Sequence, residues 1–251
     1  IMSGAGLYVV GGLACLIVGL LPAVAMTHAH AETTVVTAKV TLFGTAVTID
    51  NDETTTDIPD ALYWADAAAG EDGVVPAPQA VTAEDAWNYS YTIVEGVPTV
   101  TIQNANYQCK NRFLYIAGDF AYSINVVYIG ANTFNMGSGS SSRQFIYYCP
   151  TSSKTTPLTL IGQDDGEEKA QLDVTVGHKD GYFIQMRKVP LIIKGGTINA
   201  TQKKTAAITK LVIDNNYGSL TIEDATLNVV DVVTNSKGTA YAPNVYSIAP
   251  A

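Results

Sequence analysis

Three carboxylates in the second half of the chain are the first candidates for catalysis. Asp164 and Asp165 stand side by side in an Asp-Asp-Gly-Glu-Glu run, and Asp173 follows shortly after. Clustered carboxylates act as acid and base around a glycosidic bond in enzymes that cleave polysaccharides. The same run is typical of a solvated turn between strands, and no His or Arg accompanies these acids at a repeating position. We therefore predict no catalytic residues and no enzymatic activity.

Metal and cofactor binding are also not predicted. The run Asp50–Glu53 begins like a calcium loop but is not followed by the glycine and the final glutamate of an EF-hand. His28 and His30 form an H-x-H pair within the segment expected to be removed on export, and His178 stands alone, as is typical of a surface histidine. We expect no metal and no cofactor.

Tyrosines at strand positions are better candidates for a binding site. An exposed row of rings can stack on the faces of sugars while the hydroxyls form hydrogen bonds. Successive residues of a strand point to opposite sides, so some of these rings must belong to the core instead. The candidate ligand-binding residues are Tyr115, Tyr122, Tyr128, Tyr147 and Tyr148.

The charge of the chain argues against nucleic acid as a partner. The net charge is −9, with only 14 Lys and Arg among 251 residues. No basic residue lies between Lys39 and Lys110, where the acidic residues from Asp50 to Glu95 fall. Affinity for phosphate backbones comes mainly from Lys and Arg, so a glycan or a cell-surface polysaccharide is the more suitable partner.

Residues 1–31 predict export to the outside of the cell. The segment from Ala5 to Met26 is uncharged, and it is followed by the small-residue site Ala29-His30-Ala31. A cleaved signal peptide is the first interpretation. The apolar stretch is also long enough for an uncleaved membrane anchor, which would be the only contact with a membrane. Since Ile1 precedes Met2 and the last residues resemble the middle of a strand, we expect a fragment of a longer chain.

Two cysteines remain after the export segment. Cys109 and Cys149 are an even pair and are compatible with one disulfide in an oxidising compartment. Two buried free thiols are the alternative.

The chain between the export segment and the repeats divides into a strand pair and a linker. Residues 32–86 are predicted to contain a strand pair around Gly44 and then an acidic linker or cap, with a short helix from Asp60 to Ala69 as an option. Trp87 to Ala105 alternates apolar and polar residues around Glu95-Gly96 and predicts a hairpin.

Two interleaved series of strands recur in residues 87–251 with a period of about 30 residues. Such repeats predict an all-β fold, a single-stranded right-handed parallel β-helix, in which each turn buries one face of its strands. A β-sandwich is the alternative. If the period is real, two inward columns should form. The first column contains Ile102, Ile129, Leu160, Ile193 and Ile222, and the second contains Leu114, Ile146, Ile184 and Ile208. Asn132, Asn199 and Asn228 should stack along the repeats.

The repeated phrases resemble secreted bacterial repeat proteins labelled carbohydrate-binding-domain-containing. The resemblance runs from about Trp87 to Asn228, and its clearest phrases are Pro98–Ala105, Ile129–Phe134 and Leu191–Thr201. It implies a right-handed parallel β-helix on a secreted or cell-surface protein with a glycan ligand. The insertions at residues 137–143 and 162–169 depart from the pattern, so the stacking of residues 135–180 is where we expect irregularity.

The sequence therefore favours an extracellular or cell-surface, non-enzymatic module that binds or displays glycans. A structural stalk or adhesin segment without a small ligand is the second hypothesis. A polysaccharide-cleaving enzyme is the third.

The export segment gives the first testable prediction. The mature chain should begin near Glu32, because the apolar run ends in a signal-peptidase site after Ala31. Sequencing the N-terminus of secreted material measures this directly. A membrane-bound product that retains the residues before Glu32 would instead demonstrate an anchor.

Overall fold

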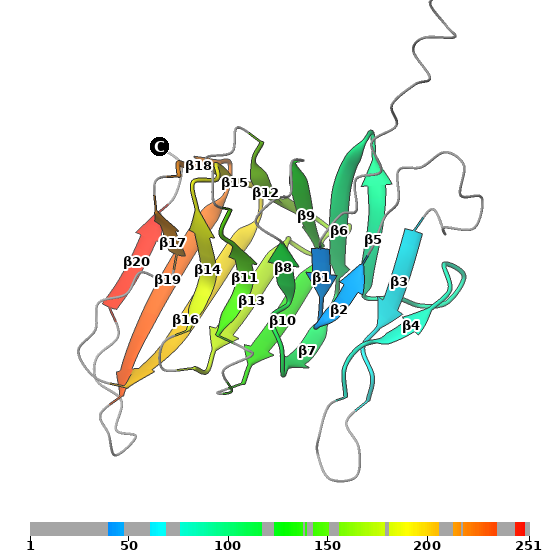
Figure 1. Cartoon of the computed structure of the whole chain (residues 1–251), viewed down its shortest axis with the longest axis horizontal. Coiled ribbons are helices and arrows are strands. Elements are labelled where there is room, and N and C mark those ends of the chain that lie inside the picture. The colour runs from blue at the N-terminus through cyan, green and yellow to red at the C-terminus, as the bar shows by residue number, and fades with distance from the viewer. Residues whose placement is uncertain are drawn as a thin grey trace, which may run out of the picture. The chain divides into compact units, whose positions relative to one another are not determined.

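The computed structural model describes residues 40–47, 61–68, 76–116, 123–137, 139, 143–150, 156–178, 181–205, 213–216, 218–234 and 244–248. They all belong to one compact unit, which spans residues 38–49 and 57–251. The regular secondary structure of these residues is entirely β, as predicted (Figure 1). Among them there is no helix of the length and hydropathy needed to cross a membrane. The segment predicted to direct export, residues 1–31, lies outside the described residues.

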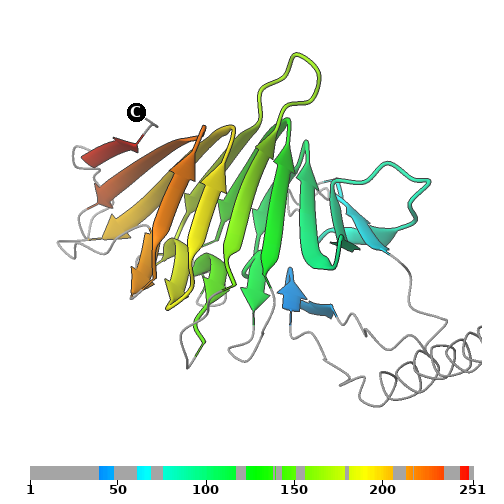
Figure 2. The same ribbon diagram turned by 90° about the horizontal axis from the view of Figure 1, so that it is seen from above.

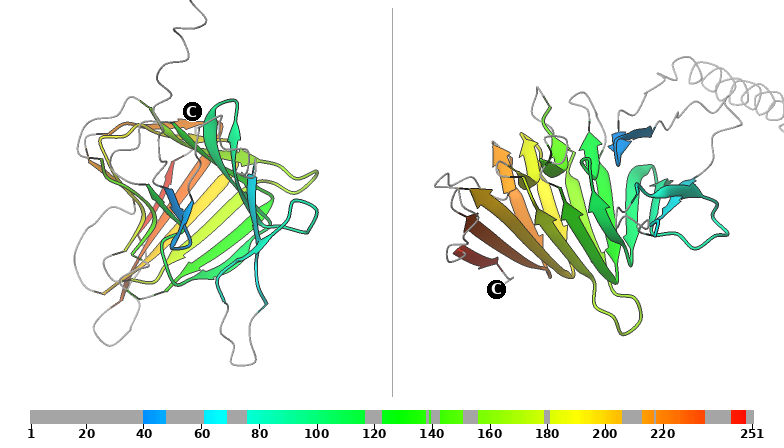
Figure 3. Two further views of the ribbon diagram at one scale, coloured as in Figure 1. Left: turned by 45° about the vertical axis from the view of Figure 1, so that its right-hand side comes forward. Right: turned by 90° about the horizontal axis from the view of Figure 1, so that it is seen from below.

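The strands form three sheets, which lie on different sides of a common interior (Figure 3). Sheet A contains, in spatial order, β17 (Ile213–Asn216), β14 (Tyr182–Arg187), β11 (Gln144–Tyr148), β8 (Leu114–Ile116), β1 (Val40–Leu42) and β2 (Thr45–Val47). Sheet B contains β18 (Leu220–Glu223), β15 (Leu191–Lys194), β12 (Leu158–Gln163), β9 (Ile124–Ile129), β6 (Val97–Gln103), β5 (Tyr89–Val94), β3 (Ala61–Ala65) and β4 (Gln79–Val81). Sheet C contains β20 (Asn244–Ile248), β19 (Thr226–Thr234), β16 (Thr197–Thr205), β13 (Gln171–Val176), β10 (Ala131–Met136) and β7 (Asn106–Cys109).

From β6 to β19 the chain visits sheets B, C and A in a repeating order. We call three successive strands, one from each sheet, a round. Each strand pairs in parallel with the strand of the same sheet in the next round, for example β9 with β12 and β10 with β13. Figure 2 shows strands of successive rounds side by side within a sheet, in the order in which the rounds follow along the chain. This parallel pairing confirms the predicted parallel sheets and contradicts an antiparallel sandwich.

The insertions at residues 137–143 and 162–169 leave the register intact. β10 pairs with β13, and β11 with β14, on either side of them. The expected irregularity is therefore confined to the connections, which can lengthen at the surface without shifting the strands they join.

The strands before the first round are antiparallel. β1 and β2 pair around Gly44, and β5 and β6 form a hairpin around Glu95-Gly96, so both sequence predictions are confirmed. The optional helix at residues 60–69 is wrong, because β3 occupies residues 61–65 and pairs with β5. Leu62 and Trp64 pack against the core from alternate positions of β3. A strand uses that two-residue period and also completes the hydrogen bonds of the sheet edge, whereas a short isolated helix is marginal.

The interior column of sheet A forms as predicted in its described part. Leu114, Ile146 and Ile184 are register partners in successive rounds and are fully buried. The partner of Ile184 in the next strand is Ile213, while Ile208 lies outside the described residues.

The column predicted for the interior of sheet B is confirmed for its last three members only. Leu160, Ile193 and Ile222 are register partners, but Ile102 and Ile129 do not belong to that column. Val100 and Val126 take their places. Ile129 is the last residue of β9 and pairs with Gln163, where the chain turns into the next sheet. Residues that recur at this turn need not occupy the same inward position within the strand.

A ladder of phenylalanines fills the centre of the core. The rings of Phe113 and Phe145 stack with their centroids 4.7 Å apart, and Phe183 follows Phe145 at 5.7 Å. Phe134 reaches the same ladder from sheet C and meets Phe145 edge to face at 4.8 Å. Since all four side chains are fully buried, the ladder joins consecutive rounds and two sheets.

The buried column of sheet B predicts a large difference between adjacent residues. Ile193→Asp should reduce the free energy of unfolding by about 3–5 kcal/mol, because it buries an unpaired charge. Lys194→Asp should cost about 1 kcal/mol or less. The substitution replaces the ion pair with Glu223 by two like charges in register, but both side chains are exposed and solvent screens the repulsion. Denaturant unfolding followed by circular dichroism measures both values. Equal effects of the two substitutions would contradict the inward position of Ile193.

Candidate functional site

Two of the candidate tyrosines form a stacked pair on the outer face of sheet A. Tyr115 on β8 and Tyr147 on β11 are register partners. Their ring centroids lie 5.6 Å apart with an interplanar angle of 9°, and both residues are half-buried. Parallel strands lie about 4.8 Å apart, so identical residues in register bring their rings together. The structure thus unites two predicted site residues that are far apart in the sequence.

Arg112 flanks this pair of rings. Its guanidinium carbon lies 4.9 Å from the centroid of Tyr147 and 5.7 Å from that of Tyr115, so it contacts both rings. Such contacts between a guanidinium and aromatic rings are attractive. Arg112 Nε also donates a hydrogen bond of 2.6 Å to Gln144 Oε1, and Gln144 Nε2 donates one of 2.6 Å to Gln185 Oε1. This chain of contacts fixes the guanidinium beside the rings.

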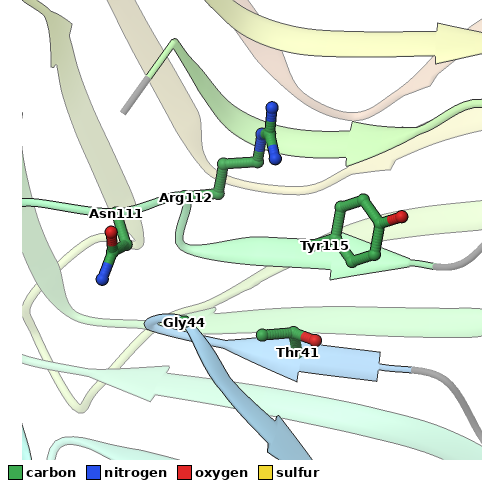
Figure 4. A pocket seen from close by; sticks show the side chains of 5 residues that line it. All are labelled: Thr41, Gly44, Asn111, Arg112 and Tyr115. Atoms are coloured by element: carbon green, nitrogen blue, oxygen red, sulfur yellow. The ribbon is translucent and has the colours of Figure 1, made fainter. Parts of the chain in front are cut away.

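A pocket opens beside Tyr115, on the side of β1 (Figure 4). Its volume is ≈ 220 Å³, and it is lined by Thr41, Gly44, Asn111, Arg112 and Tyr115. Tyr147 covers Tyr115 from the β11 side, and on the opposite side the register partner of Tyr115 is Thr41. Threonine has no ring to continue the stack, and Thr41 and Tyr115 both line the pocket on this side.

The loop that carries Asn111 depends on the turn at Gly44. Asn111 Nδ2 donates a hydrogen bond of 3.4 Å to the carbonyl oxygen of Phe43. Gly44 has a φ of 85°, and a Cβ atom there would lie 2.8 Å from Asn111 Nδ2. A larger residue at position 44 would therefore be strained and would displace one wall of the pocket.

The pocket offers hydrogen-bond donors and a ring face, with no acidic side chain in its lining. Burial, and then the neighbouring Cys149, raise the pKa of Tyr147 above its ordinary value, while Arg112 opposes this shift. The phenol next to Arg112 is therefore neutral at physiological pH. No cluster of three or more metal-ligating His, Cys, Asp or Glu side chains occurs in the part of the chain that the structure describes.

Two other candidate tyrosines are core residues, so their expected exposure is wrong. Tyr128 and Tyr148 point inward and are buried. The hydroxyl of Tyr128 donates a hydrogen bond of 2.8 Å to the carbonyl oxygen of Gly195. Its ring occupies the space left by Gly162, where a Cβ atom would lie 2.9 Å from the ring. Tyr122 lies outside the described residues.

Cys109 and Cys149 do not form the possible disulfide in the structure. Cys109 is buried at the end of β7 in sheet C. Cys149 follows β11 of sheet A, and its thiol donates a weak hydrogen bond of 3.9 Å to the carbonyl oxygen of Gln185. Cys109 therefore ends a strand of sheet C, whereas Cys149 follows a strand of sheet A.

The three carboxylates considered for catalysis each bind a different neighbour. Asp164 forms an ion pair of 2.6 Å with Lys169, which lowers the pKa of Asp164. Asp165 accepts a hydrogen bond of 3.2 Å from Asn104.

Asp173 instead begins an amide ladder on sheet C. Asn199 donates a hydrogen bond of 2.6 Å to Asp173, and Asn228 donates one of 2.8 Å to Asn199. Asn199 and Asn228 are register partners joined by this bond, so the predicted stacking of these two residues is confirmed. Asn132 differs from them, because it is buried and bonds backbone groups. Its Oδ1 accepts from the N–H of Ala105 in the preceding round, and its Nδ2 donates to carbonyls of its own corner and of Gln171 in the next round. His178, expected at the surface, is buried as well.

Sequence reasoning did not single out Arg112, Gln144 or Thr41. One signal was present: Arg112 precedes Tyr115 by the same interval as Gln144 precedes Tyr147. Equal intervals in two rounds indicate that Arg112 and Gln144 occupy equivalent places near the starts of β8 and β11.

The fold and the site together define an all-β protein with three mainly parallel sheets and a surface pocket formed by an aromatic ring, a guanidinium and an amide. Comparison with protein-family models finds no matching family, and comparisons with curated proteins and with solved structures find no match. The function of the chain must therefore be inferred from its own geometry.

Alkaline titration should distinguish exposed from buried tyrosines. Burial raises the pKa of Tyr91 and of Tyr107 from 10.0 to about 12. The folded state favours the neutral phenols, so their contribution to stability is full below pH 10 and is lost as the pH rises through about 12. Tyrosinate absorbance and circular dichroism, followed together, should show a late ionisation phase that coincides with unfolding. Complete ionisation near pH 10 with an intact dichroism spectrum would contradict this burial.

Proposed function

We propose that this chain is an exported, non-enzymatic module that binds glycans through the pocket beside Tyr115. The single observation that carries the proposal is the uncovered face of the Tyr115 ring, which ends an aromatic stack next to the polar side chains of Thr41, Asn111 and Arg112.

The chemistry of this pocket suits a sugar better than an apolar ligand. A pyranose ring has an apolar face of C–H groups, which packs on an aromatic ring, and a rim of hydroxyls that needs hydrogen-bond partners. Tyr115 provides the ring face. The Asn111 amide and the Thr41 hydroxyl provide polar partners around it.

The size of the pocket suits one sugar unit. Its volume of ≈ 220 Å³ is below the roughly 300–1,000 Å³ of pockets that enclose drug-sized molecules. A longer glycan would continue over the outer row of sheet A, where Tyr147 and Gln185 follow Tyr115 in register.

The proposed scaffold is a single right-handed parallel β-helix. The cyclic order of the three sheets and the parallel pairing of successive rounds support one continuous winding of the chain. The right-handed sense follows from the general rule that crossover connections between parallel strands are right-handed in nearly all proteins.

Location outside the cell or on its surface is part of the same proposal. The apolar segment before residue 32 supports export. An acidic surface with few cations supports a partner other than nucleic acid.

A structural stalk is the second candidate function. The phenylalanine ladder in the core and the amide ladder on sheet C both join consecutive rounds. Such ladders stiffen a repeat protein along its length, which a stalk requires and a binding module does not.

A glycan array followed by calorimetry tests the binding proposal. Tyr115→Ala should weaken binding of the selected glycan about 3- to 10-fold, since one aromatic contact contributes about 0.5–1.5 kcal/mol. Tyr63→Ala is the matched control, because Tyr63 is a half-buried tyrosine on sheet B that packs against Trp87. Its binding should equal that of the unmodified chain.

If the unmodified chain binds no glycan on the array, glycan binding is refuted and the structural stalk is favoured. Release of reducing ends from any glycan would refute the non-enzymatic part of the proposal.

A further inference from the structure

We infer that the glycan bound beside Tyr115 is acidic, and that Arg112 binds the carboxylate of a uronic acid unit. This inference rests on the proposed function and names the chemical class of its ligand.

The terminal nitrogens of Arg112 carry the inference. Of the five N–H donors of a guanidinium, only Nε–H has a hydrogen-bond partner among the described residues, namely Gln144. No described residue accepts a hydrogen bond from Nη1 or Nη2. Their outer edge is the one that pairs with a carboxylate through two parallel hydrogen bonds.

The guanidinium is held in place before any ligand arrives. Gln144, which accepts from Nε, is itself only 5% exposed and is bonded to Gln185. Tyr115 and Tyr147 support the guanidinium from one side. A fixed fork loses less conformational entropy on binding, so this arrangement favours a planar, bidentate anion.

No described acidic residue forms an ion pair with Arg112. The lining of the pocket has no Asp or Glu, and the raised pKa of Tyr147 keeps that phenol neutral. In a chain with a net charge of −9, a cation with no acidic partner among the described residues is suited to an anionic ligand. A negatively charged ligand group supplies the missing partner.

The ligand must also place its carboxylate close to its ring. Arg112 lies 5.7 Å from the Tyr115 centroid, so the ring face and the cation are within the reach of one sugar unit (Figure 4). In a uronic acid the carboxylate is attached directly to the pyranose ring. One such unit can therefore stack on Tyr115 and meet Arg112 at the same time.

A second cation lies next to this site along the chain. Arg143 is exposed and directly precedes Gln144, the residue that bonds Arg112. Uronic acid polymers carry one charge on each unit, so a neighbouring cation favours a polymer over a single acidic sugar.

The test compares oligogalacturonate with its methyl ester, in which each carboxylate is replaced by a neutral ester that carries one methyl group. Calorimetry with the full chain should show the acid binding about 10-fold or more tightly than the ester. Arg112→Gln should make the two ligands equal by weakening only the acid, and Arg112→Lys should restore part of the difference. Circular dichroism spectra confirm that each variant is folded.

Two controls separate this inference from the proposed function. Tyr115→Ala should weaken acid and ester by the same factor, because it removes stacking and not charge recognition. If acid and ester bind equally to the unmodified chain, or if Arg112→Gln weakens both alike, the acidic ligand is refuted while glycan binding stands. If neither ligand binds, and the array is silent as well, the proposed function itself is refuted. Tighter binding of a sulfated oligosaccharide than of the uronate would overturn the assignment of a carboxylate.

Discussion

In-register parallel pairing between successive rounds is the constraint on which the rest of this structure depends. When a strand lies about 4.8 Å from its counterpart one round earlier, each side chain lies next to the side chain of the equivalent position. Rows of similar residues then follow on every face. Inside, the row is the phenylalanine ladder of Phe113, Phe145 and Phe183. Outside, the same geometry stacks Tyr115 on Tyr147 and aligns the amides of sheet C.

A stack of this kind must be covered where it begins. At the first round, the antiparallel pair β1–β2 lies along β8, and β3 to β5 extend sheet B. Phe43 at the β1–β2 turn contacts Tyr89, Tyr107, Phe113 and Trp64 edge to face. The N-terminal strands thus close the aromatic core with one more ring.

The same closure produces the candidate site. On the inner face the turn adds the ring of Phe43, but on the outer face β1 presents Thr41 next to Tyr115. The inner ladder is therefore completed, whereas the outer one stops and leaves a ring face uncovered. The pocket lies where the regular repeat meets the strands that cover its end, and Arg112 enters it from the connection between β7 and β8. This explains why the site includes a residue from β1 that lies far away in the sequence.

The sequence by itself determined the all-β composition, the hairpin around Glu95-Gly96 and the inward row of Leu114, Ile146 and Ile184, because these depend on local turn residues and on a period of two. It also selected Tyr115 and Tyr147, but together with Tyr128 and Tyr148, which are buried. The alternation of side chains along a strand predicts that Tyr147 and Tyr148 point to opposite faces, but it does not predict which of the two points inward. That choice, the place of Val100 and Val126 in the column of sheet B, and the meeting of Thr41, Arg112 and Tyr115 were decided only by the tertiary structure. The physical reason is that register is set by hydrogen bonds between strands of different rounds and by the length of each corner, and a local pattern contains neither.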